Sequence, residues 1–275
     1  MGRHDAIHGG GYDESLAVAT EIHRLAADQH LLLLTDFDGT LSELVAMPDE
    51  ATVSTAVRAE MAALSALDSV TFGVVSGRRL VDVEARVHPV AEFVAGLHGL
   101  EIRGVNAEFH HQALHAVVPV VDGVVRLARR QLSWCPGIYI EDKAYAVTCH
   151  VRLSPRDLGD RALEEFEALA RPQLEARVLR ALAGARALEL LPCVDWHKGR
   201  AVAWIRERVS AHISSQVRVV YLGDDRTDED AFAALREEDI AIGVGERPHT
   251  PLIDWRLAGP ASVGRLFGHL ARLRE

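Results

Sequence analysis

A short apolar run that ends in two aspartates constrains this sequence more than any other feature. Residues 31–35 read LLLLT, and residues 36–40 read DFDGT. A continuous apolar run, unlike an alternating one, is typical of a strand whose two faces are both covered, as in a parallel sheet flanked by helices. We therefore expect a buried central strand that brings two carboxylates to its carboxyl end.

The same alternation of helix and strand recurs near both ends of the chain. Asp13 can cap the first helix, because aspartate accepts hydrogen bonds from exposed N–H groups there. The pattern predicts further helices over 54–67, 78–87, 198–209 and 228–235, and strands over 70–76, 91–97, 217–223 and 240–245. This order is typical of an α/β fold with an open, mostly parallel, Rossmann-like sheet and right-handed crossovers.

The middle of the chain has a different pattern. Residues 137–153 suggest an antiparallel hairpin with its turn at residues 141–143, followed by a helix over 160–176 and a closing strand over 186–191. A helix over 120–132 precedes them. We therefore expect an inserted α+β cap domain. The predicted organisation is a disordered tail over 1–11, a core made of 12–104 and 192–275, and a cap over 105–191.

Composition narrows the function classes. With 275 residues, 48% of them hydrophobic, the chain can bury a full core, and its net charge of −10 argues against nucleic acid as a partner. No segment resembles a signal peptide or a membrane span, so we expect a cytoplasmic protein that does not bind membranes. The three cysteines, Cys135, Cys149 and Cys193, lack metal-ligand spacing and are expected to be buried, reduced thiols.

The two aspartates after the first strand have a chemical interpretation. In open α/β sheets the ligand crevice lies at the carboxyl ends of the strands, where Asp36 and Asp38 would project. Two crowded carboxylates raise each other's pKa, and a divalent cation relieves that repulsion. Gly39 allows a tight turn whose amides, with that of Thr40, could bind phosphate oxygens. The alternative is a solvated acidic turn, since Asp and Gly are common turn residues.

Polar residues also follow other predicted strands. The strand over 70–75 is followed by Ser76, Gly77 and Arg78, which alone would indicate a helix N-cap. The motif GDDRTDED at 223–230 supplies further carboxylates, which alone would indicate an acidic helix start. These carboxylates are Asp224, Asp225 and Asp228. Lys198 opens a helix, where a cation is mildly unfavourable, so another group is expected to hold it. Together these residues predict a Mg²⁺ site that also binds a substrate phosphate.

Four of these segments, in their order, carry a family resemblance. DFDGTL, VVSGR, DWHKG and YLGDDRTDEDAF resemble the four motifs of haloacid dehalogenase-like phosphatases with an α/β type II cap, and GLHGLE at 96–101 and CHVR at 149–152 narrow the resemblance to trehalose-6-phosphate phosphatases. The resemblance spans about residues 28–270. It implies Mg²⁺-dependent hydrolysis of trehalose 6-phosphate through an aspartyl-phosphate, and functional pairing with a glycosyl-phosphate synthase.

The resemblance also implies roles for individual residues. Asp36 would be the nucleophile and Asp38 the general acid and base, while Ser76 and Lys198 would bind the phosphoryl group. Mg²⁺ would be held by Asp36, the Asp38 carbonyl and Asp224, supported by Asp225 or Asp228. The remaining substrate-binding candidates are Gly39, Thr40, Gly77, Arg78, His98, Gly99, Glu101, Lys143, Arg152 and Glu189. The ordinary alternative for Lys143 is a solvated hairpin turn, and for Glu101, Arg152 and Glu189 it is a surface position on a strand.

One position departs from the family pattern. The family commonly has a basic residue after the glutamate of the closing cap strand, where this chain has Leu191. Within the same chemistry, this favours another substrate, such as a glucosylglycerol phosphate, a sucrose phosphate or a pseudo-disaccharide phosphate. A phosphomutase, or a catalytically silent domain that binds a sugar phosphate or regulates a synthase, are further alternatives. The presence of Asp36, Asp38, Ser76, Lys198 and Asp224 together argues against silence. Asp38, which could activate water, favours hydrolysis over transfer to a second sugar.

Overall fold

The structure, a computed structural model, describes residues 13–246 and 250–275, so the expected tail over 1–11 lies outside the described residues. The chain packs as two compact units, one running up to Phe109 and resuming at Trp196, the other formed by His110–Asp195. The sequence-based boundaries, 104/105 and 191/192, fall earlier. Strand β5 (Ala107–His110) extends the larger sheet, and the Cys193 N–H donates to the Val178 carbonyl within the smaller unit.

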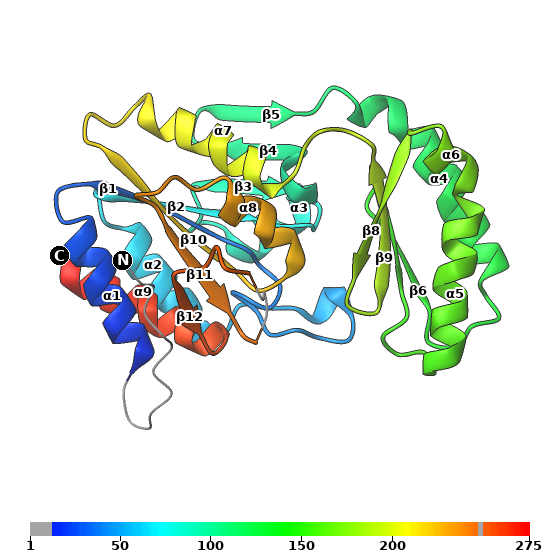
Figure 1. The fold of residues 1–275 in the computed structure, drawn as a ribbon, viewed down its shortest axis with the longest axis horizontal. Coiled ribbons are helices and arrows are strands. Elements are labelled where there is room, and N and C mark those ends of the chain that lie inside the picture. Colours follow the sequence, from blue (N-terminus) through cyan, green and yellow to red (C-terminus); the bar gives the residue numbers. More distant parts are fainter. Residues whose placement is uncertain (1–12, 247–249) are drawn as a thin grey trace. The chain divides into compact units, whose positions relative to one another are not determined.

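The larger unit is built on an eight-stranded sheet with the order β12-β11-β10-β1-β2-β3-β4-β5 (Figure 1). Its strands are β1 (His30–Thr35), β2 (Val70–Val75), β3 (Phe93–Gly96), β4 (Glu101–Gly104), β5, β10 (Val217–Gly223), β11 (Ile240–Val244) and β12 (Trp255–Leu257). Every pairing from β12 to β3 is parallel, and β4 runs antiparallel to β3. The predicted open, mostly parallel α/β sheet is confirmed.

Helices cover both faces of this sheet (Figure 1). One layer contains α1 (Glu14–Leu25), α2 (Thr55–Ser65), α3 (Leu80–Val87) and α9 (Pro260–Arg274), and the other contains α7 (Lys198–Ser210) and α8 (Glu229–Ala233). Successive residues of β1 alternate between the two layers: Leu31 and Leu33 pack in the first core, Leu32 and Leu34 in the second. This explains why the run from Leu31 to Leu34 has no polar position.

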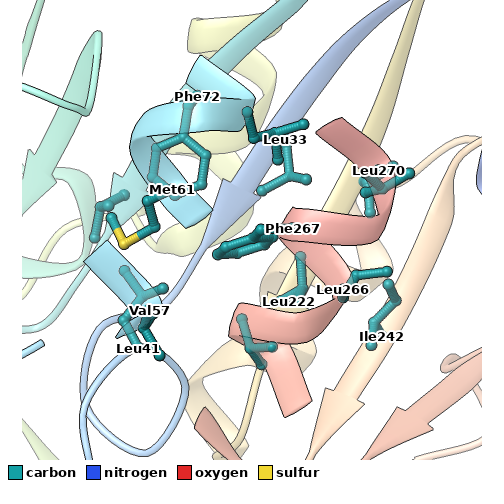
Figure 2. Packing of buried hydrophobic residues seen from close by; sticks show 14 of the residues in the cluster. Leu33, Leu41, Val57, Met61, Phe72, Leu222, Ile242, Leu266, Phe267 and Leu270 are labelled. Carbon is teal, nitrogen blue, oxygen red and sulfur yellow. The ribbon is translucent and has the colours of Figure 1, made fainter. Parts of the chain in front are cut away.

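The first core shows how tightly the layers interlock. Phe267 of α9 lies at the centre of a cluster of buried side chains from α2, α9 and the sheet, and its ring meets Phe72 edge to face at 5.6 Å between centroids (Figure 2). Leu33 and Leu222 complete the sheet side of this cluster. Burying side chains of this size stabilises the fold by about 1.5–3 kcal/mol each. The sheet is therefore a rigid base for the residues at its strand ends.

The smaller unit is an antiparallel sheet with helices on one face. Its strands are β6 (Tyr139–Asp142), β7 (Val147–His150), β8 (Leu179–Gly184) and β9 (Ala187–Pro192), in the order β6-β7-β9-β8. Its helices are α4 (Leu114–Gln131), α5 (Arg156–Leu169) and α6 (Arg171–Glu175). Val147, Cys149 and Leu190 point into a core with α4 and α5. The opposite face of the sheet carries the polar residues of the strands, as expected for a half-covered antiparallel sheet.

Some local predictions were wrong. Helix α4 begins at Leu114 rather than at 120, with Pro119 inside it, because Leu114, Val117 and Val121 continue its buried face upstream. The helix predicted over 160–176 is two helices that break at Ala170, shortly before Pro172. Strands β8 and β12 and helix α9 were not foreseen. The sequence of β8, LRALAG, contains no β-branched or aromatic residue.

Two further expectations concern membrane-spanning helices and the three cysteines. Within residues 13–246 and 250–275, no helix has the length and apolar character needed to cross a membrane. Cys135 and Cys149 are buried free thiols, as predicted, whereas Cys193 is partly exposed because it lies beyond the end of β9.

Candidate active site

The central strands end beside each other. Thr35 pairs with Leu222 in the parallel β1–β10 ladder, and the Asp36 N–H donates to the Leu222 carbonyl at 2.8 Å. The residues that follow, Asp36 on one strand and Asp224 on the other, are therefore brought to one edge of the sheet. This convergence follows from parallel pairing in register, because strands that run in the same direction end at the same edge.

Lys198 lies at the centre of the group. It is the first residue of α7, its side chain is 2% exposed, and Nζ lies 2.9 Å from Asp36 Oδ1 and 2.8 Å from Asp228 Oδ1. Burial lowers the pKa of Lys198, but the charges of Asp228 and Asp36 raise it by more, so the pKa lies above its ordinary value. These two carboxylates supply the partners that a lysine at a helix N-terminus requires.

Asp228 is fully buried and has both oxygens engaged. Oδ1 accepts hydrogen bonds from Lys198 and from the Tyr221 hydroxyl, and Oδ2 accepts from the backbone N–H groups of Asp224 and Asp225, both at 3.1 Å. It therefore orders the loop after β10 as well as the lysine.

Asp224 lies against the turn after β1. Gly39 has φ +80°, and a Cβ added there would lie 2.1 Å from Asp224 Oδ2, so this position requires glycine both for its backbone conformation and for the close approach. The Thr40 hydroxyl donates to Asp224 Oδ1 at 3.4 Å. The tight turn after the first strand thus accommodates a carboxylate from the other strand.

The carboxylates Asp36, Asp224 and Asp228 form a compact acidic group. Each offers an oxygen, and these oxygens lie within 4.8 Å of one another. Burial, the largest cause, raises the pKa of Asp36 and of Asp224; neighbouring carboxylates raise it further, while Lys198 acts in the opposite direction. Two buried carboxylates and a partly buried one share a single lysine, which leaves an excess of acidic groups. A divalent cation such as Mg²⁺, which prefers hard oxygen ligands, would relieve this excess. Because Asp228 already accepts four hydrogen bonds, Asp36 and Asp224 fit such an ion better.

Asp38 and Asp225 direct their carboxylates elsewhere. Asp38 receives two hydrogen bonds from Arg78, at 2.7 Å each, and its side chain is 36% exposed. The Asp225 carboxylate accepts from the Arg226 N–H at 2.7 Å and caps the short helix η3 (Arg226–Asp228). Neither carboxylate belongs to the acidic group around Lys198.

Arg78 is held on several sides. Besides Asp38, its guanidinium donates to Asp82 at 2.9 Å and to the Pro48 carbonyl at 2.8 Å, and it lies over the Phe37 ring. Burial lowers the pKa of Arg78, but Asp38 and Asp82 raise it by more. This rigid attachment makes Arg78 a support for the Asp38 carboxylate.

A strained loop follows β3 and contacts the segment after β2. Leu97 and His98, in the short helix η2 (Leu97–Gly99), have φ values of 49° and 58°. The His98 N–H donates to the Ser76 carbonyl at 2.8 Å, and a Cβ added at Gly77 would lie 2.8 Å from the His98 ring. Backbone strain of this kind persists only where surrounding contacts impose it, and it is frequent at functional sites. Glu101, the first residue of β4, is also buried.

The polar face of the smaller sheet carries a second charged network. Lys143 Nζ lies 2.8 Å from Glu189 Oε1 and 3.9 Å from Glu141 Oε2, and His150 Nε2 lies 2.8 Å from that same Glu141 oxygen. Lys143 and Lys198 are the two lysines among the 30 Lys and Arg residues of the chain, and both are buried and paired with carboxylates. Arg152 lies instead in the exposed turn after β7.

The departure at position 191 has a structural counterpart. In the β8–β9 ladder, Arg180 stands directly opposite the buried Leu191, and Leu182 stands opposite Glu189. Because residues opposite each other share a face of the sheet, Arg180 belongs to the same face as Glu189. A cation therefore exists next to the leucine, on the neighbouring strand.

The comparisons with known proteins agree with this arrangement. The family model for trehalose-phosphatases matches residues 34–252, which contain all the candidate residues. This chain belongs to the trehalose-phosphatase family. The predicted resemblance and the prediction of a phosphoric monoester hydrolase are thereby confirmed.

Individual relatives support the same assignment. The chain is 33% identical to a trehalose-phosphate phosphatase of Mycobacterium marinum, over 98% of this chain and 74% of that protein. It is 36% identical to one from Mycobacterium tuberculosis, over 87% of this chain and 61% of that protein. The C-terminal domain of trehalose-6-phosphate phosphatase from C. albicans has the same fold, with a TM-score of 0.77 at 22% identity over 94% of this chain and 96% of that one.

Sequence reasoning missed three residues of these networks. Tyr221 lies within the apolar run of β10 and gave no signal apart from its polarity in a fully buried strand. Arg180 lies in a strand that was not foreseen, so its register could not be used. Asp82 follows Arg78 at the i+4 spacing of a helical ion pair, a signal that was available.

Proposed function

We propose that this phosphatase hydrolyses trehalose 6-phosphate to trehalose and phosphate, through a phosphoryl group carried by Asp36 and with Mg²⁺ as its cofactor. The observation that carries the proposal is the position of Lys198, which is buried between Asp36 and Asp228 beside Asp224. A lysine and an excess of carboxylates at the ends of two parallel strands suit a dianionic phosphate and a divalent cation together.

The first step transfers the phosphoryl group. An Asp36 oxygen attacks phosphorus, a new P–O bond forms, and the bond between phosphorus and the sugar oxygen breaks. Asp38, in its protonated form, gives its proton to the leaving sugar oxygen. Lys198 and the Ser76 hydroxyl would stabilise the phosphoryl oxygens as charge develops, together with backbone amides of the turn at Gly39 and Thr40.

The second step returns the enzyme to its starting state. Asp38 accepts a proton from a water molecule, the water oxygen attacks phosphorus, and the P–O bond to Asp36 breaks, which releases phosphate. In the observed arrangement both oxygens of the Asp38 carboxylate accept hydrogen bonds from Arg78, so one of these bonds must break before that oxygen can carry the proton given to the sugar. We therefore assign Arg78 to positioning Asp38 rather than to binding the sugar.

The residues around Asp36 fit a metal cofactor. Asp36, Asp224 and the Asp38 carbonyl would hold Mg²⁺, with Asp228 orienting the loop. Asp225 is a weaker candidate because its carboxylate caps η3. When bound, the ion neutralises charge on the phosphate and lowers the pKa of the carboxylates that hold it.

We propose that polar side chains of each unit determine which sugar phosphate the enzyme accepts. His98, Gly99 and Glu101 in the larger unit are proposed to contact sugar hydroxyls. In the cap, Lys143 and Glu189 are proposed for the same role, with Arg152 as a weaker candidate because it is exposed. Arg180 would supply the cation that the family commonly carries at position 191. Sites built to hydrogen-bond hydroxyls reject ligands that lack them by large factors.

Leu191 supports a second candidate within the same chemistry, a phosphatase for another sugar phosphate. The buried Leu191 offers no charged or hydrogen-bonding group at the position where the family commonly has a cation, as expected if the substrate differs in the group bound there. A cytoplasmic location and functional pairing with a glycosyl-phosphate synthase remain proposals that accompany either substrate.

Phosphate release from a panel of esters tests the proposal. The panel contains trehalose 6-phosphate, sucrose 6-phosphate, glucosylglycerol phosphate, glucose 6-phosphate and an aryl phosphate, each with Mg²⁺ and with a chelator. We expect a strong preference for trehalose 6-phosphate and no turnover in chelator. Weak, similar rates on all esters would favour the second candidate, and full activity in chelator would contradict the metal assignment.

A further inference from the structure

A buried tyrosine donates a hydrogen bond to one carboxylate of the acidic group, and the reaction steps proposed above give this tyrosine no role. Tyr221 is fully buried in β10, and its hydroxyl donates to Asp228 Oδ1 at 2.7 Å. Its ring meets Phe232 of α8 edge to face at 5.5 Å between centroids. A buried tyrosine hydroxyl needs a hydrogen-bond partner. Here the partner is the carboxylate that also binds Lys198.

Asp228 is held from two sides. The backbone N–H groups of Asp224 and Asp225 fix Oδ2, and a Cβ added at Gly223 would lie 2.3 Å from its Cγ, so the carboxylate packs directly on the main chain. Tyr221 and Lys198 hold the other oxygen. The tyrosine is therefore the neutral donor that fixes the direction of Oδ1.

Removing that donor would change what Asp228 can do for Lys198. Without the Tyr221 hydroxyl, Oδ1 would keep one strong partner in a place that is fully buried. A buried acceptor that loses a hydrogen-bond partner is destabilised, because neither water nor protein replaces the bond. We expect the Asp228 carboxylate to rotate toward another donor. Lys198 would then shift relative to Asp36, which now lies 2.9 Å from its Nζ.

We propose that Tyr221 is a positioning residue for phosphoryl transfer: its hydroxyl orients the Asp228 carboxylate, which in turn holds Lys198 against Asp36. The proposal rests on the function proposed above for Lys198 and Asp36. Tyr221 reaches no reacting atom itself. Its effect should therefore fall on turnover of every phosphate ester equally, whichever sugar the enzyme prefers.

Tyr221→Phe removes the hydroxyl and keeps the ring. Thr71→Val is a matched control, because Thr71 Oγ1 lies 2.9 Å from His30 Nε2 in the same sheet and this contact is also buried. We expect Tyr221→Phe to lower kcat about tenfold on both trehalose 6-phosphate and an aryl phosphate, with KM changed less than threefold. Thr71→Val should lower thermal stability similarly and leave kcat within twofold.

The two lysines allow a readout that needs no substrate. With lysines labelled with ¹⁵N at Nζ, NMR reports two side chains, Lys198 beside Asp228 and Lys143 in the smaller unit as an internal reference. We expect Tyr221→Phe to move the Lys198 signal alone and Thr71→Val to move neither. An unmoved Lys198 signal, or a kcat equal to that of Thr71→Val, would overturn the proposal.

Failure of this inference and failure of the proposed function are distinguishable. If wild type prefers another ester, the proposed substrate is wrong, but the aryl phosphate rates and the Lys198 signal still test Tyr221. If Tyr221→Phe does not fold, replacing all four tyrosines by 3-fluorotyrosine keeps the ring and makes the hydroxyl a stronger donor. The Lys198 signal must then move, and an unmoved Lys198 signal overturns the proposal. The Lys143 signal is not a reference in this experiment, because Tyr145 and Tyr139 lie beside the Lys143 network.

Discussion

The two lysines of this chain occupy buried ionic networks that differ in charge balance. Lys198 pairs with Asp36 and Asp228, and Asp224 lies beside these two carboxylates, so three aspartates share one lysine and the group has an excess of acidic side chains. Lys143 faces Glu189 and Glu141 on an antiparallel sheet, where His150 adds a second potential cation. The first network has an excess of carboxylates that a metal ion would relieve, whereas the second network contains both carboxylates and their partners.

This difference suggests a division of labour. Under the proposed function, the network around Lys198 would bind the groups that every phosphate ester shares, namely the phosphoryl oxygens and the cation that accompanies them. The network around Lys143 contains both hydrogen-bond donors and acceptors. Sugar hydroxyls can use both kinds of group, so this network would distinguish one sugar from another. Changes in the first network should therefore affect all substrates, and changes in the second only the sugar phosphates.

The largest expected effect is on the nucleophile. Asp36→Asn should lower kcat more than a thousandfold on both trehalose 6-phosphate and an aryl phosphate, because the amide cannot attack phosphorus. Steady-state phosphate release measures this, with Asp68→Asn, an exposed aspartate of the same unit, as the control. A variant that retains a tenth of wild-type activity would rule out Asp36 as the nucleophile.

A smaller and selective effect is expected in the cap. Glu189→Gln keeps the shape of the side chain but removes the charge that pairs with Lys143. We expect kcat/KM to fall about thirtyfold for trehalose 6-phosphate and less than threefold for the aryl phosphate, since charged hydrogen bonds are worth about 1.5–3 kcal/mol. Parallel assays on the two esters measure the ratio. Equal losses on both would remove the proposed division of labour.

The position of the cap cation gives a sharper test. Arg180→Leu should raise KM for trehalose 6-phosphate about tenfold, because the charge opposite Leu191 is lost. The double variant Arg180→Leu, Leu191→Arg moves the cation across the ladder and should recover most of the loss. The KM values of both variants measure this. If the double variant is no better than Arg180→Leu, the cation is not shared between these strands.

The smallest expected effect concerns stability and pH. Burial raises the pKa of Asp36 and Asp224, so the metal-free fold binds protons more tightly than the unfolded chain and loses stability as pH rises through their folded pKa values. Burial raises the pKa of Glu141, but the hydrogen bond from His150 and the charge of Lys143 lower it by more. The contribution of Glu141 to folding stability is therefore lost only as pH falls below the ordinary pKa of a glutamate.

Thermal melts between pH 5 and 9 separate these two contributions. Without metal, we expect the melting temperature to fall by about 5 °C toward pH 9, and Mg²⁺ to abolish that fall. Asp224→Asn should flatten the metal-free profile, and Glu141→Gln should leave its alkaline side unchanged. A metal-free melting temperature that rises toward pH 9 would contradict an excess of buried negative charge around Lys198.

Much of this arrangement was readable from local sequence. The apolar run of β1 specified a strand covered on both faces, and parallel pairing then required its terminal aspartates to meet those that follow β10. The four motifs, in their order, indicated the family, and the family model agrees. Such features are carried by residues close together in sequence and by the general geometry of parallel sheets.

Tertiary structure alone decided which side chain meets which. That Asp38 pairs with Arg78, that Tyr221 supports Asp228, and that Arg180 stands opposite Leu191 depend on strand register and on burial. A shift of one residue in register would turn each strand side chain to the opposite face, and no local pattern in LRALAG records that choice. The sequence by itself determined the chemistry at the strand ends, and packing determined the partners that orient it.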